Sequence, residues 1–224
     1  MDDAYEAVFF DMDGVTVETA DVWRELERTT ILPAAVAGEP PVEMIRALSV
    51  ADAYDRLVAA DDVEVTVTRA AFDALYDEHA TAVYGERAVL MDGYRALLAD
   101  LRDAGVATGL VSASRRSWVD LVLDRFDLTD AYDVVVSATD FEGPSKPDPT
   151  TYLLAAETIE TEPEACLVVE DSPHGIESAV AAGMSCLALR GAGNADEDLS
   201  AADEVVSSGA ELRTAMAERG LFED

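Results

Sequence analysis

Four short segments of this sequence carry acidic, hydroxyl or ammonium side chains at the ends of apolar runs or in the loops that follow them. The segments are Asp11-Met12-Asp13-Gly14, Ser112-Ala113-Ser114, Lys146-Pro147-Asp148-Pro149 and Glu170-Asp171-Ser172. Carboxylates bind hard divalent cations, while hydroxyl and ammonium groups donate to phosphate oxygens. If the fold brings the four segments together, they have the chemistry of a site for a phosphate and a metal ion.

The two acidic segments are the candidate metal ligands. Asp11 and Asp13 follow the apolar run AVFF, and Gly14 permits a tight turn after them. Glu170 and Asp171 end the apolar run CLVV, where adjacent carboxylates without a partner are costly. A Mg²⁺ ion shared with Asp11 would remove that repulsion. The alternative is that these acids are solvated caps, with Asp171 capping a helix that begins near residue 173.

Lys146 is the only lysine in a chain that otherwise uses fourteen arginines. Its compact ammonium suits a phosphate oxygen beside acidic groups better than a guanidinium fork would. A surviving surface lysine is the competing interpretation. Ser112, at a strand end, has a short hydroxyl that can donate to phosphate. Ser114 and Arg115 lie at the start of a predicted helix, whose N-terminus favours an anion.

The elements that must position these groups alternate between strands and helices. We predict strands at residues 7–11, 106–112, 133–138, 165–171, 185–190 and 204–208. We predict helices at residues 92–104, 115–126, 149–159, 173–182 and 210–219. This alternation is typical of βαβ units, so we expect an α/β fold with a Rossmann-like parallel sheet. In such sheets ligands bind beyond the carboxyl ends of the strands, where the four segments are expected.

Residues 17–88 break the alternation and predict an inserted helical domain. Helical patterns cover residues 21–30, 41–59 and 69–84, and only residues 63–67 read as a short strand. We therefore predict two domains, an α/β core formed by residues 1–16 and 89–224 and an α-helical cap formed by residues 17–88.

The amino-acid composition limits which binding partners and which cellular compartment we expect. The net charge is −32, from 47 acidic and 15 basic residues, which disfavours nucleic acid and anionic membranes as partners. An acidic, lysine-poor chain suits molar salt, where the Debye length is about 3 Å. We expect a cytoplasmic protein of a halophile that acts on a small molecule. Cys166 and Cys186 lie in apolar runs and are expected to be buried thiols. We expect a monomer or a homodimer.

The four segments, in this order, resemble the motifs of the haloacid dehalogenase (HAD) superfamily across nearly the whole chain. FDMDGV, SKPDP and VVEDSPHGIESAVAAGM are especially similar to the branch that contains phosphoglycolate phosphatases and β-phosphoglucomutases. The resemblance implies a HAD-like core with a helical cap. It also implies a Mg²⁺-dependent phosphatase that forms an aspartyl-phosphate on a small phosphomonoester.

The same resemblance implies a role for each matching residue. Asp11 would be the nucleophile, and Asp13 the acid that protonates the leaving group and then the base that activates water. Asp11, the Asp13 carbonyl and Asp171 would hold Mg²⁺, with Glu170 either a ligand or a neighbour of the ligands. The residues expected to bind phosphate are Gly14, Ser112, Ala113, Ser114, Arg115 and Lys146.

Other activities of the superfamily can be weighed from single positions. Dehalogenases lack the second aspartate of the first motif, whereas Asp13 is present here. Phosphonate cleavage uses a lysine in the cap, and no lysine precedes Lys146. A binding protein without turnover is disfavoured because the four motifs are intact.

A β-phosphoglucomutase-like mutase is the main alternative to hydrolysis. Its members carry a histidine where this chain has Trp23, and an S-R-x-D loop where it has Ser49-Val50-Ala51-Asp52. This chain therefore lacks the second phosphate clamp, although Arg46 would partly compensate. Phosphoglycolate, hexose phosphates and nucleotide monophosphates all remain candidate substrates.

Overall fold

The computed structural model describes residues 5–39, 41–46 and 48–223. The chain divides into two compact units, one formed by Met1–Glu18 with Val89–Asp224 and the other by Thr19–Ala88. The sequence boundaries drawn at residues 16/17 and 88/89 thus lie within two residues of this division. Pairing of β2 (Val17–Glu18) with β5 (Val89–Leu90) joins the points at which the chain leaves and re-enters the first unit.

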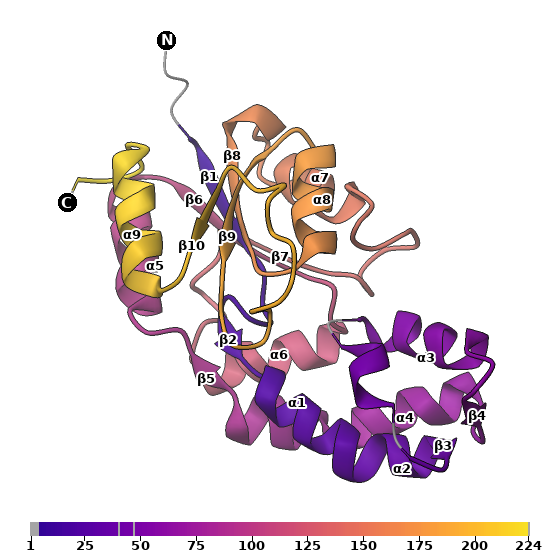
Figure 1. Ribbon diagram of the computed structural model, residues 1–224. Helices are drawn as coiled ribbons and strands as arrows, with labels where there is room; N and C mark the ends of the chain where they lie inside the picture. Colours follow the sequence, from indigo (N-terminus) through magenta and orange to yellow (C-terminus); the bar gives the residue numbers. More distant parts are fainter. Residues whose placement is uncertain (1–4, 40, 47, 224) are drawn as a thin grey trace. The chain divides into compact units, whose positions relative to one another are not determined.

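The first unit is built on a parallel sheet that contains six of the described strands, in the order β10-β9-β8-β1-β6-β7 (Figure 1). The strands are β1 (Ala7–Phe10), β6 (Ala107–Ser112), β7 (Val134–Ser137), β8 (Cys166–Glu170), β9 (Ser185–Leu189) and β10 (Glu204–Val206). All six strands predicted from the sequence are confirmed, and so is the α/β fold class. Continuous apolar runs form these strands because both faces of the sheet are buried.

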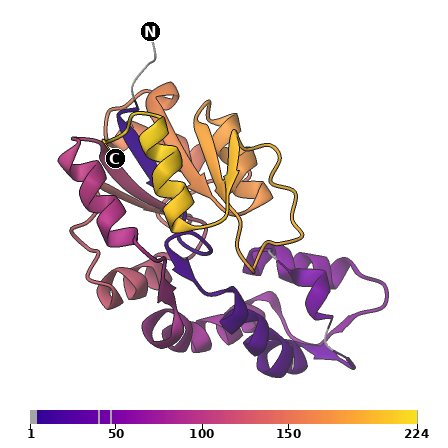
Figure 2. The same cartoon turned by 60° about the vertical axis from the view of Figure 1, so that its left-hand side comes forward.

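Helices cover both faces of the sheet. Figures 1 and 2 show α7 and α8 on one face and α5 and α9 on the opposite face, where Arg213 of α9 donates to Asp100 of α5 over 2.8 Å. The helices of this unit are α5 (Tyr94–Asp103), α6 (Arg116–Arg125), α7 (Thr150–Thr158), the 3₁₀ turn η4 (Pro163–Ala165), α8 (Pro173–Ala181) and α9 (Gly209–Glu218). One core cluster packs Phe9 and Val168 of the sheet against Tyr152 and Ile176 of α7 and α8.

The register of the sheet brings three strand ends level with one another. Phe10 of β1 is paired with Leu110 of β6 on one side and Val169 of β8 on the other. The residues that follow, Asp11 and Glu170 among them, therefore emerge at one edge of the sheet. The chain runs outward from β1 to β6 and β7 and then returns to β8 on its other side. This reversal of strand order is where open α/β sheets bind ligands.

The second unit is mainly helical. Its elements are α1 (Ala20–Leu26), the π-helix η1 (Glu27–Ile31), α2 (Leu32–Ala35), β3 (Val36–Ala37), the 3₁₀ helix η2 (Val42–Ile45), α3 (Val50–Ala59), β4 (Glu64–Val65), α4 (Arg69–Ala80) and the π-helix η3 (Thr81–Arg87). Aromatic rings form its centre: the Phe72 ring centroid lies 5.5 Å from that of Tyr54 and 5.3 Å from that of Tyr76. The Trp23 ring centroid lies 5.3 Å from that of Tyr76.

Of two sequence predictions for this unit, the first is wrong and the second is confirmed. The single helix expected over residues 41–59 is wrong, because α3 begins only at Val50, where Ser49 accepts a hydrogen bond from the Asp52 amide. The strand-like residues near 63–67 do form a strand, and it pairs with β3 through Val36 and Val65. Such two-residue strands have no periodicity of their own and depend on the pairing itself.

Among the described residues, no helix has the combination of length and apolarity that a bilayer span requires.

Candidate active site

Lys146 lies at the centre of the site, above three adjacent strand ends. Its ammonium donates to Asp11 Oδ1 over 2.6 Å, to Glu170 Oε1 over 2.7 Å and to the Val111 carbonyl over 2.9 Å. Only 5% of the lysine side chain is exposed. An ammonium group has three N–H donors, and all three are used. Burial lowers the pKa of Lys146, but the two carboxylates outweigh burial and hold that pKa above its usual value.

Glu170 is the most heavily bonded acid of the site. Its Oε1 accepts from Lys146 and from the Tyr152 hydroxyl, and its Oε2 accepts from the amides of Asp171 and Ser172 and from the Ser172 hydroxyl. A carboxylate has about four lone-pair positions, and here it meets five donors. Burial raises the pKa of Glu170, but the Lys146 ammonium and these hydrogen bonds bring it below its usual value. Glu170 is therefore ionised, and both of its carboxylate oxygens accept hydrogen bonds from the protein.

Asp11 and Asp171 carry charge that the protein only partly compensates. Burial, with help from the Glu170 carboxylate, outweighs Lys146 and raises the pKa of Asp11 to about 7. Burial and then the carboxylates of Glu170, Asp11 and Asp13 raise the pKa of Asp171 well above its usual value. Oxygens of Asp11, Glu170 and Asp171 lie within 4.8 Å of one another. This arrangement has the donor set and the excess negative charge that a hard cation would balance.

Gly14 allows the loop after β1 to pass close to Asp171. Its φ is +78°, and a Cβ added there would lie 2.0 Å from Asp171 Oδ2. Any other residue would therefore meet both a backbone penalty and a steric clash. The turn predicted from Gly14 thus also sets the spacing between Asp171 and the loop that follows β1.

Asp13 is connected to the loop after β6. Ser114 Oγ donates to Asp13 Oδ2 over 2.9 Å, and the Ser114 amide donates to Ser112 Oγ over 3.0 Å. Ser112 is 1% exposed, so its hydroxyl is fixed at the strand end. Asp13, predicted to act as acid and base, is therefore hydrogen-bonded through Ser114 to Ser112, and both serines are predicted to bind phosphate.

Two other residues of this loop, Ala113 and Arg115, were also predicted to bind phosphate. Ala113 is exposed and has no polar side-chain atom. Arg115 precedes α6, and its guanidinium lies over the Trp118 ring, 5.4 Å from the centroid. Any contact of these two residues with phosphate would therefore involve the backbone or a rearranged arginine.

Several residues of the site were missed from the sequence. Thr16 Oγ1 donates to the Asp11 carbonyl over 2.8 Å, and Asn194 Nδ2 donates to the Asp171 carbonyl over 2.7 Å. Tyr152 donates to Glu170, and Gly175 leaves room for that carboxylate, since a Cβ on Gly175 would lie 1.9 Å from Glu170 Cδ. The contacts of Asn194 and Tyr152 join residues 23 and 18 positions apart, the space at Gly175 depends on how α8 packs, and the Thr16 contact depends on the path of the loop after β1. Of these residues, only Gly175 could have been noticed in the sequence, because a glycine inside a predicted helix suggests close packing at that position.

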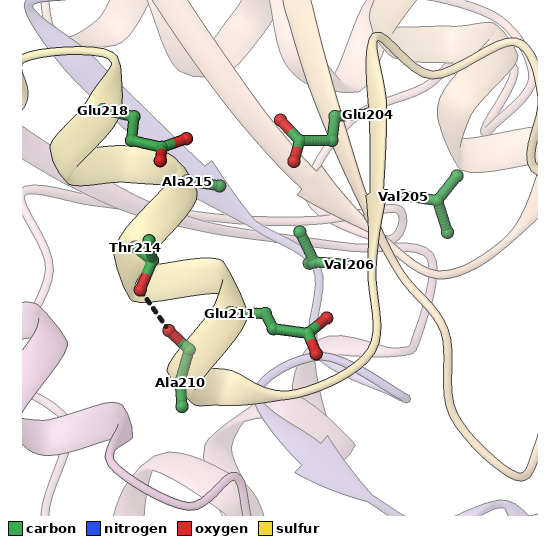
Figure 3. Close-up of a pocket in the computed structure, with 8 residues that line it drawn as sticks. All are labelled: Glu204, Val205, Val206, Ala210, Glu211, Thr214, Ala215 and Glu218. Atoms are coloured by element: carbon green, nitrogen blue, oxygen red, sulfur yellow. Dashed lines mark hydrogen bonds between the residues drawn. The ribbon is translucent and has the colours of Figure 1, made fainter.

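A surface hollow elsewhere in the first unit has different chemistry. Figure 3 shows it between β10 and α9, lined by Glu204, Val205, Val206, Ala210, Glu211, Thr214, Ala215 and Glu218. Its three glutamates would repel a phosphate, and none of the predicted site residues lines it.

Comparison with known proteins gives the chain a family. The model of haloacid dehalogenase-like hydrolases matches residues 5–183. The chain is 30% identical to the phosphoglycolate phosphatase of Shigella boydii over 196 residues, 87% of this chain and 70% of that protein. It is 29% identical to the phosphorylated carbohydrates phosphatase of Thermotoga maritima over 181 residues, 80% of this chain and 82% of that protein. Matches to three further curated relatives span only 23% to 40% of those proteins.

The solved structures agree with this assignment. A HAD family hydrolase from Deinococcus radiodurans, crystallised with bound phosphate and sodium, superposes with a TM-score of 0.76 at 26% identity. The match covers 98% of both chains. The similarity therefore includes both the sheet that carries the acidic and lysine side chains and the inserted helical segment.

Proposed function

This chain belongs to the haloacid dehalogenase-like hydrolase family, and we propose that it is a phosphoric monoester hydrolase, as two relatives are by name. We propose that it removes phosphate from a small metabolite through a phosphoryl group carried on Asp11. The observation that carries the proposal is the buried ammonium of Lys146, which joins Asp11 to Glu170 across neighbouring strand ends. A buried cation placed against one carboxylate oxygen holds the nucleophile and reduces its repulsion of a phosphate.

The acidic cluster fits Mg²⁺, because every available donor atom is an oxygen. Glu170 already meets more donors than it has lone pairs, so we assign the ion to Asp11 and Asp171, together with the Asp13 carbonyl implied by the family resemblance. A bound Mg²⁺ would neutralise charge on the phosphate and on Asp11.

The protein's own groups then divide the reaction into two displacements. Asp11 attacks phosphorus, and the ester oxygen leaves with a proton from Asp13. Asp13 next takes a proton from water, and that water attacks the phosphorus of the aspartyl-phosphate, which releases inorganic phosphate and regenerates Asp11. The Ser112 hydroxyl donates to a phosphate oxygen during both steps. Lys146 and Ser114 each exchange one present hydrogen bond, to Asp11 and to Asp13 respectively, for a phosphate oxygen when the substrate binds.

We propose phosphorylated carbohydrates as the first substrate class to test, in line with the name of the Thermotoga maritima relative. Phosphoglycolate comes second, after the name of the Shigella boydii relative. Nucleotide monophosphates are the third class of candidate substrates to test. The two named classes carry hydroxyl or carboxylate groups that the second unit, as a cap, would need to recognise.

The test is phosphate release from these monoesters with Mg²⁺ in high KCl, comparing wild type with Asp11→Asn. We expect the variant to lose about 10³-fold or more in kcat, as loss of a covalent nucleophile does. Asp127→Asn is the matched control, because Asp127 is exposed and Asn tolerates its φ of 49°. Equal phosphate release by wild type and Asp11→Asn would reject the proposed function.

The mutase alternative requires a second phosphate clamp in the second unit. Ser49 and Asp52, which occupy the corresponding segment, instead bond to each other at the start of α3, with Ser49 Oγ 2.6 Å from Asp52 Oδ2. We therefore place hydrolysis first. Formation of glucose 6-phosphate from β-glucose 1-phosphate, without release of phosphate, would reverse that order.

We also propose that the protein works in a salt-rich cytoplasm. The net charge of −32 leaves strong repulsion between surface acids at low ionic strength. The same charge disfavours nucleic acids and anionic membranes, so a small phosphorylated metabolite is the partner we propose.

A further inference from the structure

Tyr152 lies beneath the lysine of the site and is fully buried. It is the third residue of α7, which begins just after the segment that carries Lys146. Its hydroxyl donates to Glu170 Oε1 over 2.9 Å, and the Lys146 Nζ lies 4.8 Å from the centroid of its ring. One side chain thus contacts both the acid and the ammonium of the site.

The hydroxyl acts on the same carboxylate oxygen that accepts from Lys146. The other oxygen of Glu170 is held by the amides of Asp171 and Ser172 and by the Ser172 hydroxyl. The Tyr152 hydroxyl therefore completes the set of contacts that prevents the carboxylate from rotating. Gly175 supplies the space in which the carboxylate sits.

The ring has a second effect on the lysine. An aromatic face near a buried ammonium attracts it and leaves its three N–H donors free for the carboxylates and the carbonyl. Tyr152 is in turn fixed by the core, where its ring stacks on Phe9 with centroids 6.5 Å apart. The ammonium is thereby connected to the rigid centre of the sheet.

We propose that Tyr152 is a positioning residue: its hydroxyl fixes the Glu170 carboxylate, and that carboxylate holds Lys146 against the nucleophile Asp11. This inference rests on the proposed function, since Asp11 is taken as the nucleophile. A purely structural tyrosine would satisfy its own hydroxyl and stabilise the core without affecting Lys146.

The chain offers a direct probe, because Lys146 is its only lysine. Protein labelled with ¹⁵N-lysine would give one side-chain ammonium signal in NMR, and that signal reports Lys146 without assignment. In wild type we expect slow exchange of the ammonium protons with water, because three acceptors hold them. In Tyr152→Phe we expect a shifted signal and exchange at least several-fold faster.

Tyr5→Phe is the matched control. It removes a hydroxyl of the same unit that bonds to Ser185 Oγ over 2.9 Å, away from the site. Its ammonium signal should match wild type. An ammonium signal in Tyr152→Phe that keeps the wild-type shift and exchange rate overturns the proposal, whatever happens to the thermal stability.

Kinetics separate this inference from the proposed function. We expect Tyr152→Phe to lower kcat by about 10-fold, the lower end for a hydrogen bond to a charged group, with little change in KM. A wild-type kcat in Tyr152→Phe also overturns the inference. Absence of phosphatase activity in wild type would instead refute the proposed function, while the ammonium signal would still decide whether Tyr152 positions Lys146.

Discussion

Lys146 illustrates how much one residue type matters at this site. Its ammonium fits between two carboxylates and a carbonyl because it is small and its three donors point in different directions. A guanidinium is planar and larger, and the site is closed around the side chain. The composition of the chain, with arginine at all other basic positions, is consistent with that requirement.

We therefore predict that Lys146→Arg folds but loses about 10²-fold in kcat, the scale expected when a reacting group is displaced by about 1 Å. Arg125→Lys, on the exposed end of α6, is the reciprocal control and should retain activity. Steady-state kinetics with Mg²⁺ measures both. Full activity in Lys146→Arg would mean that only the charge matters.

The raised pKa of Asp11 predicts a pH effect on stability. Its folded pKa of about 7 lies above the ordinary value of 3.8, so the folded state binds more protons between these values. Stability from this group is present below pH 4 and lost as pH rises through 7. In EDTA, Asp11→Asn should therefore have a higher Tm than wild type at pH 8, with the difference shrinking toward pH 5.

Mg²⁺ should reverse that difference, because it binds the ionised carboxylates. At pH 8 we expect Mg²⁺ to raise the Tm of wild type more than that of Asp11→Asn. Differential scanning fluorimetry at constant KCl measures all four conditions. A Tm difference between the two proteins that does not change with pH would contradict the pKa assignment.

At the scale of elements, the loop after β1 must pass over Asp171, and Gly14 makes this passage feasible. We predict that Gly14→Ala abolishes activity and weakens binding of Mn²⁺, measured by titration with electron paramagnetic resonance. Gly183→Ala is the control, because it has a similar φ of +81° and open space around its Cβ. Both variants lose about 1 kcal/mol from backbone strain, but only Gly14→Ala should lose the metal.

The second unit contains its own titrating contact, between α4 and η1. Glu27 accepts from the Tyr76 hydroxyl over 3.0 Å, and burial raises the pKa of Glu27 to about 7. Ionisation above that pH thus costs stability. Glu27→Gln should raise Tm at pH 8 and leave it nearly unchanged at pH 5, as thermal melts of the two proteins would show. A lower Tm for Glu27→Gln at pH 8 would indicate that the carboxylate is stabilising when ionised.

Helices and strands could be predicted where the pattern of neighbouring residues alone determines them. Runs such as AVFF and CLVV predict strands, and all six core strands follow from such runs. The break at Ser49 was missed because a capping serine inside an amphipathic stretch looks like any polar residue. Tyr152 and Asn194 were missed for a different reason, since their partners lie 18 and 23 residues away and are fixed only by packing.

The surface charge belongs to the whole molecule. The protein has a net charge of −32, so repulsion among its acidic side chains opposes folding at low ionic strength. At 0.1 M salt this repulsion is screened only beyond about 10 Å, the Debye length. We predict that Tm and activity rise with KCl and level off near 1 M, where the Debye length is about 3 Å. Replacing the exposed acids Asp61, Asp62 and Glu64 by amides should reduce this dependence. A Tm independent of KCl would argue against a halophilic protein.

The proposed phosphatase mechanism depends on covalent chemistry at Asp11. Its most direct test is acid quenching during turnover with Mg²⁺, followed by digestion and mass spectrometry of the N-terminal peptide. We predict one phosphoryl group on Asp11 in wild type during turnover, and none on this peptide in Asp11→Asn. Phosphate release by wild type without any phosphoryl group on this peptide would refute covalent chemistry at Asp11.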